Sequence, residues 1–127
     1  MLTAFCQVVT SLLRPTDLFG RIGGEEFASL LPDTGRQDAL VLAERLRAAF
    51  ETTPHKLAER PLTATVSVGV AISDDESFDL SALLDAADQA LYRAKALGGN
   101  RVELSRHSAT ARSTKQSAAL FSTASSG

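Results

Sequence analysis

The sequence predicts an α+β domain in which helices cover a mostly antiparallel sheet. Residues 62–72 alternate apolar residues with mostly small ones at period two, as expected for a strand with one strongly buried side. Residues 39–50 and 80–94 repeat apolar side chains at helical spacing. Two short apolar runs, residues 18–22 and 27–31, flank the stretch GGEE and predict a β-hairpin. The expected order of elements is αββαβαβ.

The chain should begin with a helix over about residues 2–13, because apolar side chains recur there every three or four residues. Pro15 disfavours the helical conformation at Arg14, so the helix should end before it. In the hairpin that follows, Gly23 and Gly24 can accept positive φ angles and let the chain turn sharply. The hairpin therefore places its acidic residues at its tip.

A second helix should extend to about Glu51, with Asp33 and Thr34 as its candidate caps. The segment HKLAERP, residues 55–61, is expected to be a linker to the strand of period two.

A third helix is expected over residues 80–97, where two glycines end it, and RVEL suggests a last short strand. Residues 105–127 are rich in Ser, Thr and Ala and contain no acidic residue. Such a composition is not expected to bury a core. We therefore predict a folded domain over residues 1–104 and a disordered tail over residues 105–127.

Composition limits the classes of partner. The 127 residues are 44% hydrophobic and carry a formal net charge of −2, with both signs scattered along the chain. No broad positive field is expected for nucleic acid or anionic lipid, so a small ligand is the expected partner. Cys6 is the single cysteine, which excludes an internal disulfide and fits a reducing compartment. The apolar opening segment lacks a positive n-region and is too short to span a bilayer, so we expect a cytoplasmic chain without membrane contact.

Glu25 and Glu26 place two carboxylates beside two glycines. Carboxylates on a tight turn can approach a hard cation, and glycines let a flat or phosphorylated ligand come close to the backbone. The alternative is a solvated turn with two ordinary surface acids. From the hairpin alone both interpretations stay open.

Four short segments follow one another along the chain in a characteristic order. They are RPTD at residues 14–17, GGEEF at 23–27, SVGVA at 67–71 and ADQALYRAK at 87–95. In sequence and order they resemble the motifs of the GGDEF family of diguanylate cyclases, in the variant with Glu at the third signature position. The resemblance covers about residues 2–104 and implies a nucleotidyl-cyclase or palm-like fold, which is ferredoxin-like.

The resemblance also implies a reaction. Two GTP molecules, one on each subunit of a homodimer, condense to cyclic di-GMP with release of pyrophosphate, and Mg²⁺ or Mn²⁺ assists. By position Glu25 would be a metal ligand and the catalytic base, and Glu26 a second metal contact. Gly23 and Gly24 would lie against guanine, and Lys95 would bind the GTP phosphates.

In this family RxxD is the site where the product cyclic di-GMP binds and inhibits turnover. Arg14 and Asp17 match it, because an arginine fork can hold phosphate or guanine and an aspartate can accept from guanine N–H groups. The family adds an arginine from the next helix, for which Arg45 is the better match and Arg47 the alternative.

The chain departs from the family in two places. The family's first strand, which lies within the sheet and carries a metal-binding aspartate, would precede Met1. We expect its loss to leave backbone unpaired and apolar surface exposed. Gly99 stands where the family commonly has a phosphate-binding arginine, so Lys95 would act with less help. The chain alone is therefore expected to be inactive as a cyclase.

Two other functions are compatible with the sequence. One is a receptor that binds cyclic di-GMP through RxxD without catalysis. The other is a truncated product with no activity.

Overall fold

A computed structural model of the protein describes residues 2–57, 60–62, 64–73, 79–106 and 116–126. Within these residues the elements, in chain order, are α1 (Leu2–Leu12), β1 (Leu18–Gly23), β2 (Glu26–Leu31), α2 (Arg36–Thr52), β3 (His55–Leu57), β4 (Arg60–Leu62), β5 (Ala64–Ser73), α3 (Leu80–Ala96), β6 (Val102–Leu104) and β7 (Ser117–Ser126).

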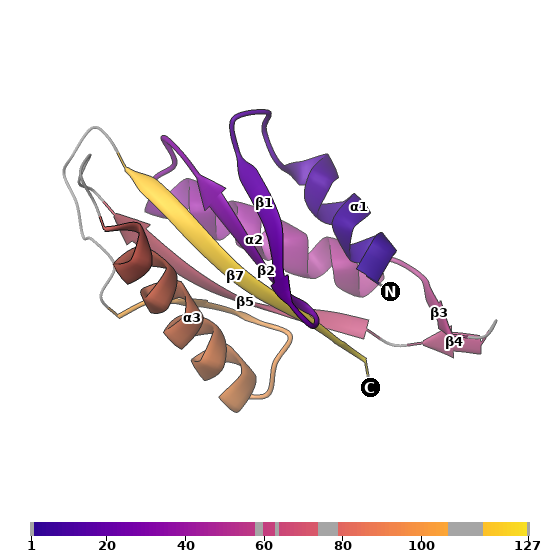
Figure 1. Ribbon diagram of the computed structural model, residues 1–127. Coiled ribbons are helices and arrows are strands. Elements are labelled where there is room, and N and C mark those ends of the chain that lie inside the picture. Colours follow the sequence, from indigo (N-terminus) through magenta and orange to yellow (C-terminus); the bar gives the residue numbers. More distant parts are fainter. Residues whose placement is uncertain (1, 58–59, 63, 74–78, 107–115, 127) are drawn as a thin grey trace.

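The main sheet has five strands in the order β1-β2-β7-β5-β6. All neighbours are antiparallel except β5 and β6, which are parallel. Helices α1 and α2 pack on one face of the sheet and α3 packs on the other (Figure 1). The predicted α+β architecture with a mostly antiparallel sheet is confirmed. The prediction of a linker over residues 55–61 is wrong for its described part, which forms β3 and most of β4, two strands that pair in a separate hairpin.

An aromatic cluster forms the core beneath α1 and α2. The ring of Phe5, on α1, lies 4.8 Å from that of Phe27 and 5.5 Å from that of Phe50, measured between centroids. All three side chains are buried. This cluster joins both helices to the hairpin that carries the two glutamates, since Phe27 directly follows Glu26.

On the opposite face of the sheet, α3 packs very close to β5. A Cβ atom at Gly69 would lie 2.2 Å from the backbone oxygen of Ala87 and from the backbone nitrogen of Leu91. The helix can therefore pack here only against a glycine. Asp79 caps the start of α3 by accepting hydrogen bonds from the backbone N–H groups of Ser81 and Ala82.

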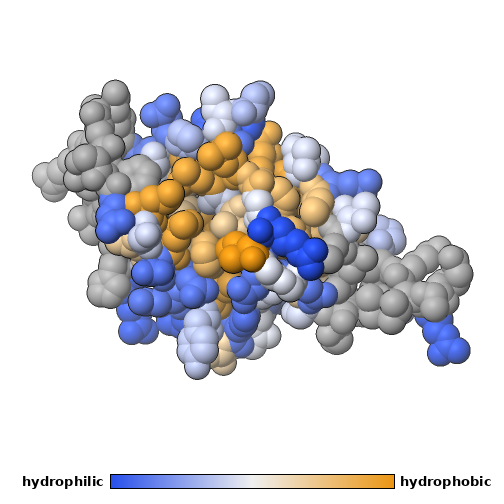
Figure 2. All heavy atoms as spheres, in the orientation of Figure 1, coloured by the Kyte–Doolittle hydropathy of each residue, from blue (hydrophilic) through white to orange (hydrophobic). Residues whose placement is uncertain are grey.

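α3 leaves part of this face uncovered, over β1 and β2. Leu18 and Ile22 are 62% and 52% exposed, and they line a shallow apolar depression together with Leu30, Leu80 and Leu84. Figure 2 shows apolar side chains gathered on this side of the molecule. This depression is thus an exposed apolar surface beside α3.

The prediction of a disordered tail is wrong for residues 117–126, which form β7. Ala118, Leu120 and Ala124 are buried in the core beneath α1 and α2, and Ala119 packs on the α3 side. Most residues of this strand are Ser, Thr and Ala, so it lacks the alternation of large apolar and polar residues by which a strand is predicted from sequence. Residues 107–115, also predicted to be disordered, lie outside the described residues.

The expectation of unpaired backbone inside the sheet is also wrong. β7 lies between β2 and β5 and pairs with both of them. Along β5 the pairing runs from Ala64 opposite Ser126 to Ser73 opposite Ser117. The interior edges of β2 and β5 are therefore satisfied by the chain's own last strand.

The predicted capping of α2 by Asp33 or Thr34 is wrong as well. The N-cap is Gly35, which has no side chain to bond. The Thr34 hydroxyl instead accepts a hydrogen bond from Arg14 and donates to the Pro32 carbonyl, and Asp33 adopts a positive φ of 51°. Both residues therefore belong to the turn between β2 and α2 and do not cap the helix.

Replacing Gly69 with alanine should destabilise the protein by at least about 2 kcal/mol, because the new methyl group meets backbone atoms that cannot move independently. Thermal unfolding followed by circular dichroism measures the effect. Gly23→Ala is the matched control, since a Cβ there meets nothing within 4 Å. Equal melting temperatures for the two variants would contradict the close packing of α3 on β5.

Removing residues 107–127 should abolish cooperative melting, because β2 and β5 would each lose a row of backbone partners in the middle of the sheet. A synthetic peptide of residues 116–127 should restore the transition, whereas a scrambled peptide should not. A shortened chain that melts cooperatively at the temperature of the full chain would show that β7 is not part of the sheet.

Candidate functional site

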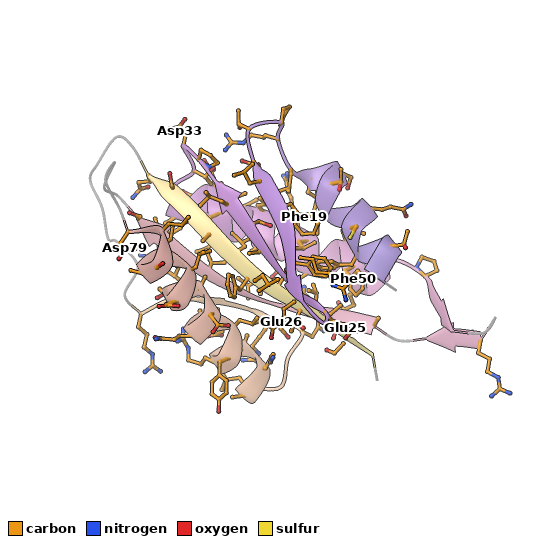
Figure 3. The ribbon with its side chains drawn as sticks, viewed as in Figure 1. Phe19, Glu25, Glu26, Asp33, Phe50 and Asp79 are labelled. Carbon is orange, nitrogen blue, oxygen red and sulfur yellow. The ribbon has the colours of Figure 1, made fainter. Side chains whose placement is uncertain are left out.

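The two glutamates lie at one end of the sheet, where β1 turns into β2 (Figure 3). Gly24 adopts a φ of +54° in this turn, and its carbonyl accepts a 2.8 Å hydrogen bond from Nε of Arg21. Glu25 is exposed on the turn, whereas Glu26 is the first residue of β2 and half-buried. The turn thus presents one carboxylate to solvent and holds the other against the sheet.

Lys95 reaches Glu26 from the last turn of α3. Its Nζ lies 3.6 Å from Oε1 of Glu26, and the side chains are 46% and 41% exposed, respectively. The sheet and α3 therefore bring together two predicted site residues that are far apart in the sequence. At this exposure the ion pair adds little to stability, so its significance is that it places a cation beside the hairpin.

Hydroxyl groups occupy the neighbouring positions on the sheet. Thr123 of β7 lies opposite Glu26 on one side and opposite Ser67 of β5 on the other. The buried Ser67 hydroxyl accepts a 3.1 Å hydrogen bond from the backbone N–H of Asn100. We call Glu26, Lys95, Thr123 and Ser67 the hairpin site.

The turn after α3 explains the glycine at position 99. Gly99 has a φ of +73°, and a Cβ there would lie 3.2 Å from the Ser67 hydroxyl. An arginine at this position would have to adopt a backbone conformation that side chains with a Cβ rarely take. The turn therefore favours a glycine at this position.

A pocket of about 360 Å³ lies between the end of α1 and the start of α2, apart from the hairpin site. A terminal nitrogen of Arg14 donates to the Asp17 carboxylate at 3.2 Å, to the Pro32 carbonyl at 2.7 Å and to the Thr34 hydroxyl at 2.6 Å. The Asp17 side chain is only 2% exposed, whereas that of Arg14 is 51% exposed. Arg45 lines the same pocket. We call Arg14, Asp17 and Arg45 the arginine pocket.

Arg47, the alternative to Arg45 for the product site, does not line this pocket. Its guanidinium bonds to Glu44, Glu51 and the side-chain oxygen of Asn100. The hydrogen bond from Arg47 lowers the pKa of Glu44, and the same bond raises the pKa of Arg47. Arg47 thus ties α2 to the turn after α3, which leaves Arg45 as the arginine of α2 that lines the pocket.

Comparison with known proteins decides the family. The family described as "Diguanylate cyclase, GGDEF domain" matches residues 1–101. The chain belongs to this family. It is 40% identical over 104 residues to Response regulator PleD of Caulobacter vibrioides, covering 80% of this chain and 23% of that protein. It is 44% identical over 93 residues to Diguanylate cyclase DgcP of Pseudomonas aeruginosa, covering 72% of this chain and 14% of that protein. The chain thus spans less than a quarter of the length of these curated relatives.

Solved structures share the fold. The active GGEEF domain of a diguanylate cyclase from Vibrio cholerae aligns with a TM-score of 0.74 at 31% identity, covering 84% of this chain and 67% of that one. The GGDEF domain of DgcB from Caulobacter crescentus, in complex with c-di-GMP, aligns with a TM-score of 0.75 at 26% identity, covering 81% and 61%. The recognition of a GGDEF domain from its motifs is confirmed.

The described residues do not form a resident metal site. Cyclases of this family are generally metal-dependent, and Mg²⁺ prefers carboxylates and phosphate oxygens as ligands. Here Glu26 is paired with Lys95, and the residue opposite it on β7 carries a hydroxyl. No three Asp, Glu, His or Cys residues come together anywhere in the described part of the chain. The roles assigned to Glu25 and Glu26 as metal ligands stay predictions.

Sequence analysis missed Thr123 and Ser67 as members of the hairpin site. Ser67 lies within a motif that was assigned to a strand, and Thr123 lies in the segment predicted to be disordered. Neither residue type carries a chemical signature, so only the strand pairing could have indicated them.

Among the described helices, none has the length and apolar character required to cross a membrane.

The Glu44–Arg47 contact should make a small pH-dependent contribution to stability. Because the pKa of Glu44 is lowered in the folded protein, the contribution is present above its ordinary value of about 4.5 and is lost as the pH falls through the lower, folded value. Glu44→Gln should therefore reduce stability at pH 7 by no more than about 1 kcal/mol, because the pair is exposed. Below pH 4 the difference from the unaltered protein should shrink.

Melting curves between pH 3 and pH 7 measure this effect, with Asp85→Asn, an exposed acid on α3, as control. A Glu44→Gln difference that stays constant across this range would contradict an ionised contact with Arg47.

Proposed function

We propose that this chain is the carboxy-terminal part of a diguanylate cyclase domain and that the complete domain condenses two GTP molecules into cyclic di-GMP. The chain alone is proposed to be inactive as a cyclase and to retain binding of the product. The observation that carries the cyclase proposal is the meeting of Lys95 with the signature residue Glu26, because phosphate-binding and acidic groups must adjoin in such a site.

The hairpin can accept a nucleotide. Nothing lies within 4 Å of the positions that Cβ atoms would occupy at Gly23 and Gly24, so a flat base can approach the backbone there. Lys95 supplies a positive charge for a phosphate group. Glu25, exposed on the same turn, is proposed as the group that accepts the proton of an attacking 3′-hydroxyl.

The chemistry requires two such sites facing each other. In each half-reaction the 3′-oxygen of one GTP bonds to the α-phosphorus of the other, the bond from that phosphorus to the bridging oxygen breaks, and pyrophosphate leaves. One bound GTP provides only one nucleophile and one α-phosphate. A homodimer of complete domains is therefore proposed as the active form.

The arginine pocket is proposed as the site where cyclic di-GMP binds. Arg14 keeps half of its side chain exposed while Asp17 holds it in place, so the guanidinium is fixed in direction yet accessible. Arg45 offers a second cation in the lining of the same pocket. The structurally similar DgcB domain was determined in complex with c-di-GMP, which supports this ligand class.

A non-catalytic receptor is the second candidate function. The observation that favours it is that Arg14, Asp17 and Arg45 line one pocket, whereas the residue facing Glu26 in the hairpin site is not a carboxylate. The two functions differ in whether GTP is turned over.

Arg45→Ala should weaken cyclic di-GMP binding by at least about tenfold, because a charge-assisted hydrogen bond contributes roughly 1.5–3 kcal/mol. Arg14→Ala should do the same, with melting curves to verify its fold because Arg14 also bonds to Pro32 and Thr34. Glu25→Ala is the matched control and should leave binding unchanged. Isothermal titration calorimetry provides the measurement.

Unaltered affinity in a folded Arg45→Ala variant would exclude the arginine pocket as the product site. The same protein incubated with GTP and Mg²⁺ should form no cyclic di-GMP by chromatography. Product formation that disappears in Glu25→Ala would overturn both the expected inactivity and the receptor.

A further inference from the structure

The last strand of the chain contributes directly to the hairpin site. β7 enters the sheet between β2 and β5, and its register places residue 123 level with Glu26. Directly paired residues of antiparallel strands point to the same face of the sheet. The side chains of Glu26, Thr123 and Ser67 therefore form a row across three strands, on the face where Lys95 projects from α3.

The distance across such a pair suits a shared cation. Side chains directly opposite each other on antiparallel strands have Cβ atoms about 4.5–5.5 Å apart. Two carboxylates at that separation can bind one divalent ion, whose oxygen ligands lie at roughly 2.0–2.6 Å. A carboxylate and a neutral hydroxyl supply only one negative charge for the same task.

We propose that Thr123 is the residue that determines cation binding at the hairpin site. Its hydroxyl leaves Glu26 without a carboxylate on the facing strand, so Glu26 pairs with Lys95 and the folded chain does not hold a divalent cation tightly. The same position would bind a divalent cation if it carried an aspartate. This inference does not depend on product binding in the arginine pocket.

The surroundings of Thr123 support this assignment. Ser67, the residue on its other side, is buried and its hydroxyl is engaged by the backbone of Asn100, so it adds no charge. Thr123 itself is half-buried, so a longer side chain at this position could still reach solvent. Residue 123 is thus the position on β7 from which an acidic group could join Glu26.

Manganese binding tests the proposal, with Mn²⁺ as a paramagnetic probe followed by electron paramagnetic resonance. Thr123→Asp should bind Mn²⁺ at least about tenfold more tightly than the unaltered chain, and Thr123→Asp combined with Glu26→Gln should lose that gain. Ser117→Asp is the matched control, because it adds the same charge to the same face at the far end of β7. It should leave Mn²⁺ binding unchanged.

Three outcomes would overturn the proposal. They are tight, Glu26-dependent Mn²⁺ binding by the unaltered chain, no gain in a folded Thr123→Asp variant, and an equal gain in Ser117→Asp. Cyclic di-GMP titration of the same variants separates this result from the proposed function, since the arginine pocket should bind equally well in all of them.

A cysteine cross-link tests the placement independently if Thr123→Asp does not fold. In a Cys6→Ser background, Ser67→Cys with Thr123→Cys should form an intramolecular disulfide on oxidation, because the two residues pair directly. Ser67→Cys with Ser117→Cys should not, since residue 117 lies six positions along the strand. Absence of the first cross-link in folded protein would overturn the placement of Thr123 and the proposal with it.

Discussion

The pairing of β7 with β2 and β5 is the constraint on which the rest of the structure depends. In the sheet order β1-β2-β7-β5-β6, the hairpin strands connect to the other half of the sheet only through β7. A strand in this position satisfies the backbone groups of both neighbours, and each buried group left unpaired would be costly. The last strand in the sequence is thus the central strand of the fold.

This arrangement determines how Lys95 reaches the hairpin. α3 packs on β5 through the contact at Gly69, which fixes the distance of the helix from the sheet. β7 in turn fixes the distance between β5 and β2, so the end of α3 and the start of β2 meet with Lys95 beside Glu26. The ion pair is therefore a consequence of strand order and close helix packing, and its own small energy does not create it.

Sequence patterns predicted the elements that carry a regular apolar or glycine signal. The period-two residues of β5, the apolar stripe of α3 and the glycine turn at Gly23 and Gly24 each have a signal of this kind, and each forms the predicted element. By resemblance, the family motifs assigned the signature glutamates and Lys95 to GTP and its metal, and Arg14, Asp17 and Arg45 to the product. The structure places Lys95 beside Glu26 and places the other three residues around one pocket.

β7 could not be predicted in the same way, because its sequence lacks the regular alternation of apolar residues that marks β5. Apart from Leu120 and Phe121, its positions are filled by Ala, Ser and Thr, which resemble a flexible tail in composition. The prediction that Asp33 or Thr34 caps α2 was also wrong. The Thr34 side chain has the chemistry of a cap, but Arg14, twenty residues earlier, engages it, and such a long-range competitor has no local signal.

The two candidate sites depend on β7 at opposite ends of the strand. Just before its start, the carbonyl of Gln116 accepts a 2.9 Å hydrogen bond from the backbone N–H of Thr34, whose hydroxyl in turn binds Arg14 of the arginine pocket. Toward its other end, Thr123 lies between Glu26 and Ser67 in the hairpin site. Residues of the arginine pocket come from a short stretch of sequence and need β7 only as a support. The hairpin site combines residues from three strands and a helix, so its chemistry changes with whatever side chain the central strand supplies.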